Sequence, residues 1–237
     1  MVDVLGVKFH NLDMQQAIER AWVAMEEKSS AYVCTPNPEI VWNCRSDQNL
    51  QTALVGASLV LADGVGITLA AKILGTPMKA RIPGIDFATA LIEQLAKKGK
   101  SIFLYGAKPG IAALAAEKLI QQYPDLQIAG VADGYGDSEA VAAEIRQAAP
   151  DFLLVCLGSP KQEQWMQAHV GSLNVGLMAG LGGALDVFSG TVKRAPRIWR
   201  KLGLEWFYRL CKEPYRIKRM IKLPLFLLLV CKKRIFS

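Results

Sequence analysis

A carboxylate closes one of the most apolar runs in the chain. Asp63 ends the segment SLVLAD and is followed at once by Gly64. At the rim of a buried strand a carboxylate is partly desolvated, which raises its pKa toward the range that suits a general base. A helix N-cap or an Asx turn would place the same residue there, so the local sequence leaves both interpretations open.

Other polar side chains also follow apolar runs. Thr35 and Asn37 alternate with prolines in TPNP, and they could donate to phosphate oxygens or only shape a turn. Arg81, an isolated cation in KARIPGID, suits either a diphosphate or a surface ion pair. Gln162 and Gln164, near the start of a predicted helix, are either neutral donors to a ligand or solvated side chains.

Two glycine-rich turns accompany these residues. The turn Gly106–Gly110 joins a predicted strand to a predicted helix, where backbone amides can approach a diphosphate. It matches neither the G-x-G-x-x-G nor the Walker pattern, so an ordinary strand-to-helix turn explains it equally well. A second turn contains Gly180, Gly182 and Gly183, and it either lets a ligand approach the backbone or only relieves crowding.

The elements that must position these residues alternate in type. Strands are predicted at 31–35, 58–62, 101–105, 127–131, 152–157 and 175–179, with helices at 14–27, 49–55, 65–74, 86–98, 111–123, 138–148 and 161–170. Continuous apolar strands separated by helices indicate an α/β fold, with a mostly parallel, Rossmann-like sheet covered by helices on both faces. Ligands of such sheets bind beyond the carboxyl ends of the strands, so we expect a pocket for a nucleotide-linked ligand there.

The positive charge is concentrated in the last fifth of the chain. Residues 193–237 hold 14 of the 28 Lys and Arg against two acids, whereas residues 1–192 hold 14 basic and 19 acidic residues. We therefore expect a catalytic domain at 1–192 and a basic, amphipathic, helical appendage at 193–237. The basic residues alternate with large apolar ones, which is typical of a helix that lies on an anionic membrane surface.

Other uses of the appendage remain open. It could pack on the protein's own core, and its apolar run 223–230 is far shorter than the roughly 20 residues that span a bilayer. Nucleic-acid binding is disfavoured, because no zinc-finger spacing or RNA-recognition signature is present. With only two histidines, a histidine metal centre is not expected, and no Ser-His-Asp or Cys-His set is evident.

The cysteines and the N-terminus indicate a compartment. The five cysteines are odd in number and form no Cys-x-x-Cys pair, and Cys34 and Cys156 lie within apolar runs, which favours buried thiols in a reducing environment. The first residues do not resemble a signal peptide. We therefore expect a cytoplasmic protein that is peripheral on the inner face of the cell membrane.

Several segments together resemble one family. They are TPNPEIV at 35–41, LADGVG at 61–66, RIPGID at 81–86, YGAKPG at 105–110, GSPKQEQW at 158–165, GLGGALDVFSG at 180–190 and KRAPRIW…GLEWFYRL…EPYRIKR at 193–219. Their order and spread across nearly the whole chain resemble the bacterial TagA/WecG/CpsF glycosyltransferases, glycosyltransferase family 26. The resemblance implies transfer of N-acetylmannosamine, or a related sugar, from a UDP donor to undecaprenyl-diphosphate-linked N-acetylglucosamine. Such a step serves teichoic acid linkage-unit or other surface polysaccharide synthesis.

The resemblance also assigns roles to residues. Asp63 matches the general base of an inverting transfer that requires no metal or other cofactor. The resemblance implies that Thr35, Asn37, Arg81 and Gln162 hold the donor diphosphate and sugar, and that Tyr135 and Asp186 contact the uridine. Arg209, Arg216 and Arg219 would close over the site and stabilise the leaving UDP, as positive charge can do for a departing diphosphate.

The expected site therefore has two groups of residues. The expected catalytic set is Asp63, Thr35, Asn37, Arg81 and Gln162. The expected substrate-binding set is Gly106, Tyr135, Gln164, Gly180, Gly182, Asp186, Arg209, Arg216 and Arg219. A non-catalytic UDP-sugar or anionic-lipid binding module is the alternative function, and a homo-oligomer is compatible with the sequence. The donor sugar and the polymer that is made are left open.

Overall fold

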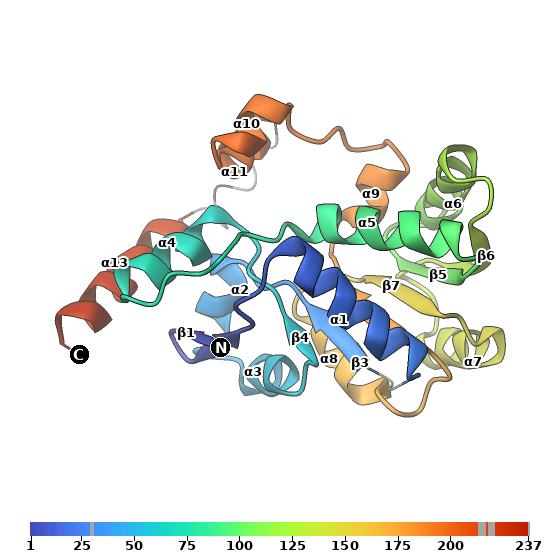
Figure 1. Cartoon of the computed structure of the whole chain (residues 1–237), viewed down its shortest axis with the longest axis horizontal. Coiled ribbons are helices and arrows are strands. Elements are labelled where there is room, and N and C mark those ends of the chain that lie inside the picture. Colours follow the sequence, from blue (N-terminus) through green and yellow to red (C-terminus); the bar gives the residue numbers. More distant parts are fainter. Residues whose placement is uncertain (29–30, 213–216, 218–220, 237) are drawn as a thin grey trace.

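Six parallel strands form the centre of the molecule (Figure 1). The computed structural model describes residues 1–28, 31–212, 217 and 221–236. The strands are β3 (Ala31–Cys34), β4 (Leu59–Val60), β5 (Ser101–Gly106), β6 (Gln127–Ala132), β7 (Phe152–Cys156) and β8 (Leu177–Gly180). They lie in the order β4-β3-β8-β7-β5-β6, and each neighbouring pair is parallel. The predicted α/β class and parallel sheet are confirmed.

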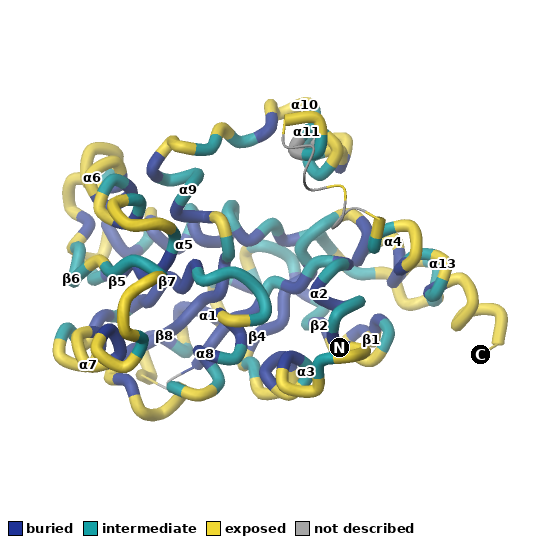
Figure 2. The backbone as a smooth tube through the Cα atoms, turned by 180° about the vertical axis from the view of Figure 1, so that it is seen from behind, coloured by how far each residue is buried: buried dark blue, intermediate teal, exposed yellow. Residues whose placement is uncertain are grey.

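Helices cover both faces of this sheet, as expected. One core cluster contains side chains of α1 (Met14–Glu26), α5 (Gly84–Lys97), α6 (Ile111–Gln122) and the short α9 (Ala184–Phe188). The other contains side chains of α2 (Pro38–Asn43), α3 (Gln48–Val55), α4 (Val65–Ile73), α7 (Ser138–Ala148) and α8 (Lys161–His169). Figure 2 shows the buried strands enclosed between these layers.

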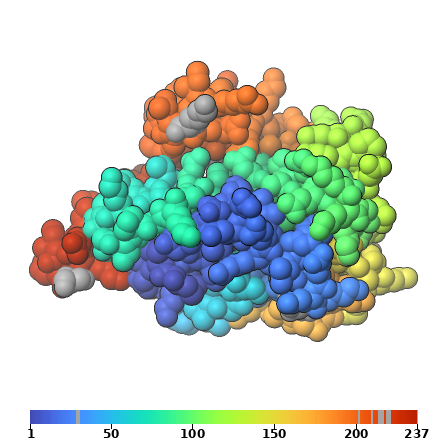
Figure 3. Space-filling view, viewed as in Figure 1, coloured from blue at the N-terminus to red at the C-terminus, as the bar shows by residue number. Residues whose placement is uncertain are grey.

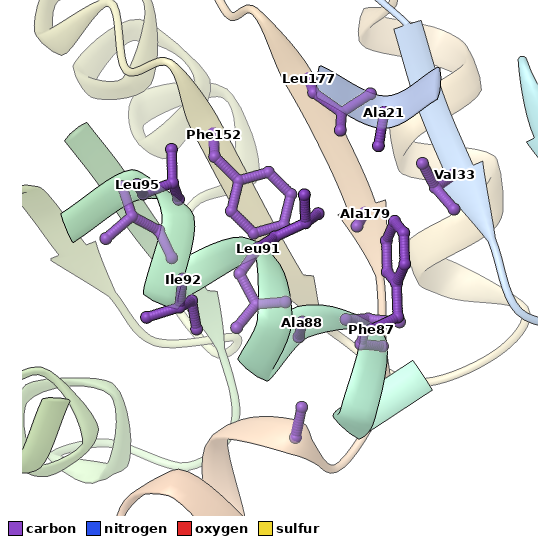
Figure 4. Close-up of a cluster of buried hydrophobic side chains, with 14 of the residues drawn as sticks. Ala21, Val33, Phe87, Ala88, Leu91, Ile92, Leu95, Phe152, Leu177 and Ala179 are labelled. Atoms are coloured by element: carbon purple, nitrogen blue, oxygen red, sulfur yellow. The ribbon is translucent and has the colours of Figure 1, made fainter. Parts of the chain in front are cut away.

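Helix α5 illustrates how packing fixes the residues at the carboxyl edge of the sheet. Its side chains Phe87, Leu91 and Leu95 recur every four residues and are fully buried. Figure 4 draws this face of α5 against β3, β7 and β8. Burying each such side chain stabilises the fold by about 1.5–3 kcal/mol. Since Phe87 is held in the core, its neighbour Asp86 is held at the start of α5.

A two-stranded antiparallel sheet was not anticipated. It consists of β1 (Val2–Val4) and β2 (Val7–Phe9), joined by Leu5 and Gly6, which both have positive φ. Alternate residues of the two strands are buried in the same cluster as α2 and α3. The period-two pattern in VDVLGVKF was the available signal.

The C-terminal part is helical, as predicted, and one of its helices packs on the body. It contains α10 (Arg197–Lys201), α11 (Glu205–Lys212) and α13 (Lys222–Ile235). Figure 1 shows α13 beside α4, and its side chains Phe226 and Val230 are fully buried in the cluster shared with α2 and α4. The opposite face leaves Leu225 42% and Leu228 67% exposed. Within the described ranges, no helix is long and apolar enough to cross a membrane.

Candidate active site at the carboxyl edge of the sheet

Three neighbouring strands bring predicted site residues to one place. Thr35 follows β3, Asp63 follows β4 by three residues, and Gly180 ends β8. Because β4, β3 and β8 are adjacent and parallel, their carboxyl ends meet at the same edge. The Oγ1 atom of Thr35 lies 3.5 Å from the carbonyl oxygen of Gly180. The sheet order therefore supports the predicted location of the site.

Asp63 does not cap the helix that follows it. The N-cap of α4 is Gly64, with φ of +88° and no side-chain capping bond, so the N-cap interpretation of Asp63 is wrong. Its charge acts instead on Arg194. Burial alone would lower the pKa of the Arg194 guanidinium, but Asp86, Glu205 and Asp63 raise it above its ordinary value. Asp63 thus lies within electrostatic reach of an arginine from the C-terminal segment.

Asn37 has a structural task, and Arg81 belongs to a polar cluster. The Oδ1 atom of Asn37 accepts a hydrogen bond of 3.0 Å from the backbone N–H of Ile40, which caps α2. The cap uses the oxygen only, so the amide nitrogen is the atom that could donate to a substrate oxygen. Arg81 donates from Nη2 to the carbonyl oxygen of Arg200 at 3.2 Å. This bond joins Arg81 to the C-terminal segment, and its predicted contact with a diphosphate stays a prediction.

Gln162 is buried, with 4% of its surface exposed, and both ends of its amide are bonded. Its Oε1 accepts from the backbone N–H of Gly182 at 2.9 Å, and its Nε2 donates to Oε1 of Glu163 at 2.9 Å. A Cβ atom at Gly180 would lie 3.2 Å from Nε2 of Gln162, so this glycine leaves room for the amide. The structure thus brings Gln162, Gly180 and Gly182 together at the end of β8.

Glu163 was not singled out from the sequence, although it is a buried acid. Only 1% of its surface is exposed, and its Oε2 makes no hydrogen bond within the described part of the chain. Burial raises the pKa of the Glu163 carboxyl, against the opposing hydrogen bond from Gln162. Glu163 orients the Gln162 amide by accepting a hydrogen bond from its Nε2. The only sequence signal was the segment KQEQW, in which an acidic residue directly follows Gln162.

Gly106 has a local reason to be glycine. Its φ is +122°, and a Cβ atom there would lie 2.4 Å from the carbonyl oxygen of Cys156 on the neighbouring strand. Backbone atoms cannot move aside as a flexible side chain can, so the close approach of β5 and β7 accounts for this residue. A contact with phosphate at Gly106 stays a prediction.

Three further predicted residues lie in the loop after β6, in α8 and in α9. Tyr135 is 72% exposed in the loop after β6, and β6 and β4 are the two outer strands of the sheet. Gln164 is half-buried in α8. Asp186, in α9, binds through its backbone: its carbonyl oxygen accepts from Thr191 Oγ1 and from Val192 N–H, both at 2.9 Å. The contacts of Tyr135 and Asp186 with uridine, and of Gln164 with the substrate, stay predictions.

The predicted arginines of the C-terminal segment are described only in part. Arg209 lies in α11, and its side chain is outside the described set. Arg216 and Arg219 fall outside the described residues altogether.

A cluster of arginines and acids at this edge was missed. It joins the first turn of α5 to residues 190–204, which we call the strap and which connect α9 to α11. Arg194 binds Asp86 with both terminal nitrogens, at 2.5 and 2.9 Å, and Arg200 Nη1 lies 3.9 Å from the same carboxylate. Arg194 and Arg200 had been counted only as charge of the appendage, and Asp86 only as the start of a helix. Local patterns contain no signal for a contact 108 residues apart.

The three cysteines within residues 1–192 are buried and are not suited to act as nucleophiles. Cys34, Cys44 and Cys156 are buried, as predicted for the first and last of them, and burial raises the pKa of Cys156 to about 12. Cys211 and Cys231 are exposed. In the parts of the chain that the structure describes, no three His, Cys, Asp or Glu side chains are grouped as for a metal ion.

Comparisons with known proteins show which family the chain belongs to. The model of the "Glycosyl transferase WecG/TagA/CpsF family" matches residues 2–237. A Bacillus subtilis (strain 168) protein is 39% identical over 210 residues, which are 88% of this chain and 82% of that protein. A Staphylococcus aureus (strain MW2) protein is 35% identical over 237 residues, covering 98% and 93%.

Both relatives carry the name "N-acetylglucosaminyldiphosphoundecaprenol N-acetyl-beta-D-mannosaminyltransferase", as does a Bacillus spizizenii protein that is 36% identical over 209 residues, 88% of this chain and 81% of that protein. The resemblance inferred from the motifs is confirmed. The chain is an enzyme and belongs to the WecG/TagA/CpsF family of glycosyl transferases.

Proposed function

We propose that the protein transfers N-acetylmannosamine, or a related sugar, from UDP to N-acetylglucosamine linked to undecaprenyl diphosphate. The names of the relatives support the acceptor and the sugar. The observation that carries the proposal is that the Asp63 carboxylate, at the carboxyl edge of the sheet, lies within electrostatic reach of the Arg194 guanidinium. A base for the acceptor and positive charge for a diphosphate are what this reaction requires.

The chemical step follows from these groups. Asp63 removes the proton from the 4-hydroxyl of the acceptor sugar while that oxygen attacks C1 of the donor sugar. The bond between C1 and the diphosphate oxygen breaks, and its electron pair leaves with UDP. Attack from the face opposite the leaving group inverts the anomeric carbon.

Positive charge near the leaving group comes from arginines in this proposal. Arg81 lies at the same edge, and its Nη2 meets the strap at the carbonyl oxygen of Arg200. Arg209, Arg216 and Arg219 would add to this charge when the site closes. Arginine suits a diphosphate because its planar group donates two parallel hydrogen bonds. The proposed reaction accordingly needs no divalent cation.

The C-terminal segment would hold the enzyme at the membrane that contains the acceptor. The outer face of α13 presents Leu225 and Leu228, and Ile235 is 76% exposed near the basic run 232–234. An apolar face flanked by cations is the pattern of a helix that lies in the headgroup region. We propose peripheral attachment to the inner face of the cell membrane.

The test is a donor screen. Purified protein is mixed with a short-chain prenyl-diphosphate-N-acetylglucosamine acceptor, one UDP-sugar at a time and anionic vesicles, and the released UDP is measured with and without EDTA. We expect release with UDP-N-acetylmannosamine or one close relative, unchanged by EDTA. Binding of every UDP-sugar without release would support the non-catalytic alternative, and loss with EDTA would contradict the arginine mechanism.

Membrane attachment is tested on the two faces of α13. Leu228→Ser should weaken binding to anionic vesicles while the melting temperature stays unchanged, since Leu228 is exposed. Phe226→Ala is the matched variant, and it should lower stability by about 3–5 kcal/mol because Phe226 is buried. Equal vesicle binding by the wild type and Leu228→Ser would contradict attachment through this face.

A further inference from the structure

Asp86 is the centre of the cluster that joins the strap to the body. Its two carboxylate oxygens each accept a hydrogen bond from Arg194, and Arg200 approaches one of them at 3.9 Å. Burial alone would raise the pKa of the Asp86 carboxyl, but Arg194, Arg200 and Arg81 lower it below its ordinary value. The carboxylate is therefore ionised at neutral pH and binds Arg194, which is 108 residues away in the chain.

This carboxylate is not used by its own helix. The N-cap of α5 is Pro83, and no side chain makes a capping bond there. An acid in a first helical turn ordinarily serves the helix dipole. Asp86 makes bidentate hydrogen bonds to Arg194, a residue of the strap, which Figure 1 shows as an arch running from α9 to α10 above α5. Figure 3 shows the orange residues of the strap and α11 standing over the green and teal helices.

The two strap arginines retain donors that no group in the described part of the chain uses. The Nε atoms of Arg194 and Arg200 are buried and make no hydrogen bond within the described residues. Glu205 Oε1 lies 3.9 Å from Arg194 Nε, beyond hydrogen-bond distance. Buried N–H groups are nearly always bonded, so two buried cationic donors without a described partner are candidate contacts for an anionic ligand.

We propose that Asp86 is a positioning residue: it seats the strap across the carboxyl edge and holds Arg194 and Arg200 beside Asp63, where they bind the diphosphate of the donor. The inference rests on the proposed function for the identity of the ligand. Asp86 acts through the arginines and does not touch the sugar. Arg194 and Arg200 thereby join Arg81 as binding residues for the leaving group.

The test is a double-mutant cycle on kcat and on the KM for the UDP-sugar. Asp86→Asn keeps the shape and removes the charge, and Arg194→Lys keeps the charge and removes the bidentate hydrogen bonds. Each is expected to lower kcat by about 100-fold, the scale of a displaced catalytic group. The double variant should be no worse than the poorer single variant, because both changes break one contact. Asp86→Glu should recover part of the activity.

Trypsin cleavage within the strap measures its seating without any activity. Asp86→Asn should be cleaved there about tenfold faster than the wild type, because opening of the strap becomes easier. Asp151→Asn is the matched control, since Asp151 is a paired carboxylate at the opposite edge, and it should leave strap cleavage and kcat unchanged. Melting temperatures confirm that each variant is folded.

Several results would overturn the inference. Wild-type kcat in Asp86→Asn would do so, as would losses that multiply in the double variant, or wild-type cleavage of the strap. If the wild type transfers no sugar at all, the proposed function fails on its own, while faster cleavage of Asp86→Asn would still establish the seating of the strap.

Discussion

The two edges of the sheet use aspartate in opposite ways. At the amino edge, Asp151 precedes β7 and accepts from Lys100 Nζ at 2.9 Å, from the Ser101 N–H at 2.9 Å and from Ser101 Oγ at 3.1 Å. Ser101 Oγ in turn accepts from the N–H of Asp151 at 3.1 Å. Both carboxylate oxygens are bonded by residues that begin the adjacent strand β5.

At the carboxyl edge the bonding is incomplete. Asp86 binds arginines from the strap, and those arginines keep buried Nε donors that have no partner in the described chain. Polar groups that bond one another fully stabilise a fold, whereas a cluster with unused donors has capacity for a ligand. The difference indicates which edge serves chemistry, although both edges contain a charged pair.

The largest expected effect separates the two edges by activity. Asp63→Asn removes the proposed base and should lower sugar transfer by about 10²- to 10⁴-fold. The melting temperature should stay near that of the wild type, because Asp63 caps no helix. Asp151→Asn should transfer sugar at the wild-type rate. UDP release is measured on both purified variants. Comparable losses of activity in the two would contradict the distinction between the edges.

Two glycine substitutions at the carboxyl edge distinguish a glycine needed for backbone packing from one that leaves room for a site residue. Gly106→Ala places a methyl group against the backbone of Cys156 and should destabilise the fold by about 3 kcal/mol or more. Gly180→Ala meets movable side chains, Met166 and Gln162, and should reduce activity more than stability. Urea unfolding and UDP release are measured on both. A stable, inactive Gly106→Ala would instead favour the predicted phosphate contact.

The hydrogen bonds of Asp151 at the amino edge should contribute measurably to the free energy of unfolding. Asp151→Asn is expected to lower the free energy of unfolding at pH 7 by about 1.5–3 kcal/mol, the range for hydrogen bonds to a charged group. Burial alone would raise the pKa of Asp151, but its bonds to Ser101 and Lys100 lower it. A lowered folded-state pKa gives stability that is complete above the ordinary value of 3.8 and is lost as the pH falls below it.

The acid dependence provides the control for this prediction. Denaturant unfolding at pH 3 and pH 7 should show a smaller difference for Asp151→Asn than for the wild type. Asp86→Asn should show the same trend, because its pKa is also lowered. An unchanged acid dependence in both variants would contradict the pKa directions.

The smallest effect concerns the buried acid behind Gln162. Glu163→Gln keeps an oxygen for the Gln162 amide and removes an ionisable group whose folded-state pKa is raised from 4.5. The wild type loses stability as the pH rises above 4.5, because burial penalises the ionised form, and the variant does not. We expect the variant to gain about 1 kcal/mol over the wild type between pH 4.5 and pH 8. A gain in stability below pH 4.5 instead would contradict the raised pKa of Glu163.

The sequence predicted most of what depends on local patterns. The six parallel strands followed from apolar runs, and Asp63, Thr35 and Gly180 were placed at one edge because each follows a strand. The hairpin β1–β2 was missed despite its alternating pattern, and α2 and α9 are too short for periodicity. Asp86, Arg194 and Arg200 could not be connected, because the strap crosses the edge only in the folded chain.

The place where α13 docks has a mechanical consequence. It rests on α2 and α4, and these helices start at Pro38 and Val65, one residue after Asn37 and two after Asp63. Lys222 Nζ also donates a hydrogen bond of 2.9 Å to Asn43 Oδ1, at the end of α2. A tilt of α13 on the proposed membrane surface would therefore be transmitted through α2 and α4, whose first turns follow Asn37 and the proposed base Asp63.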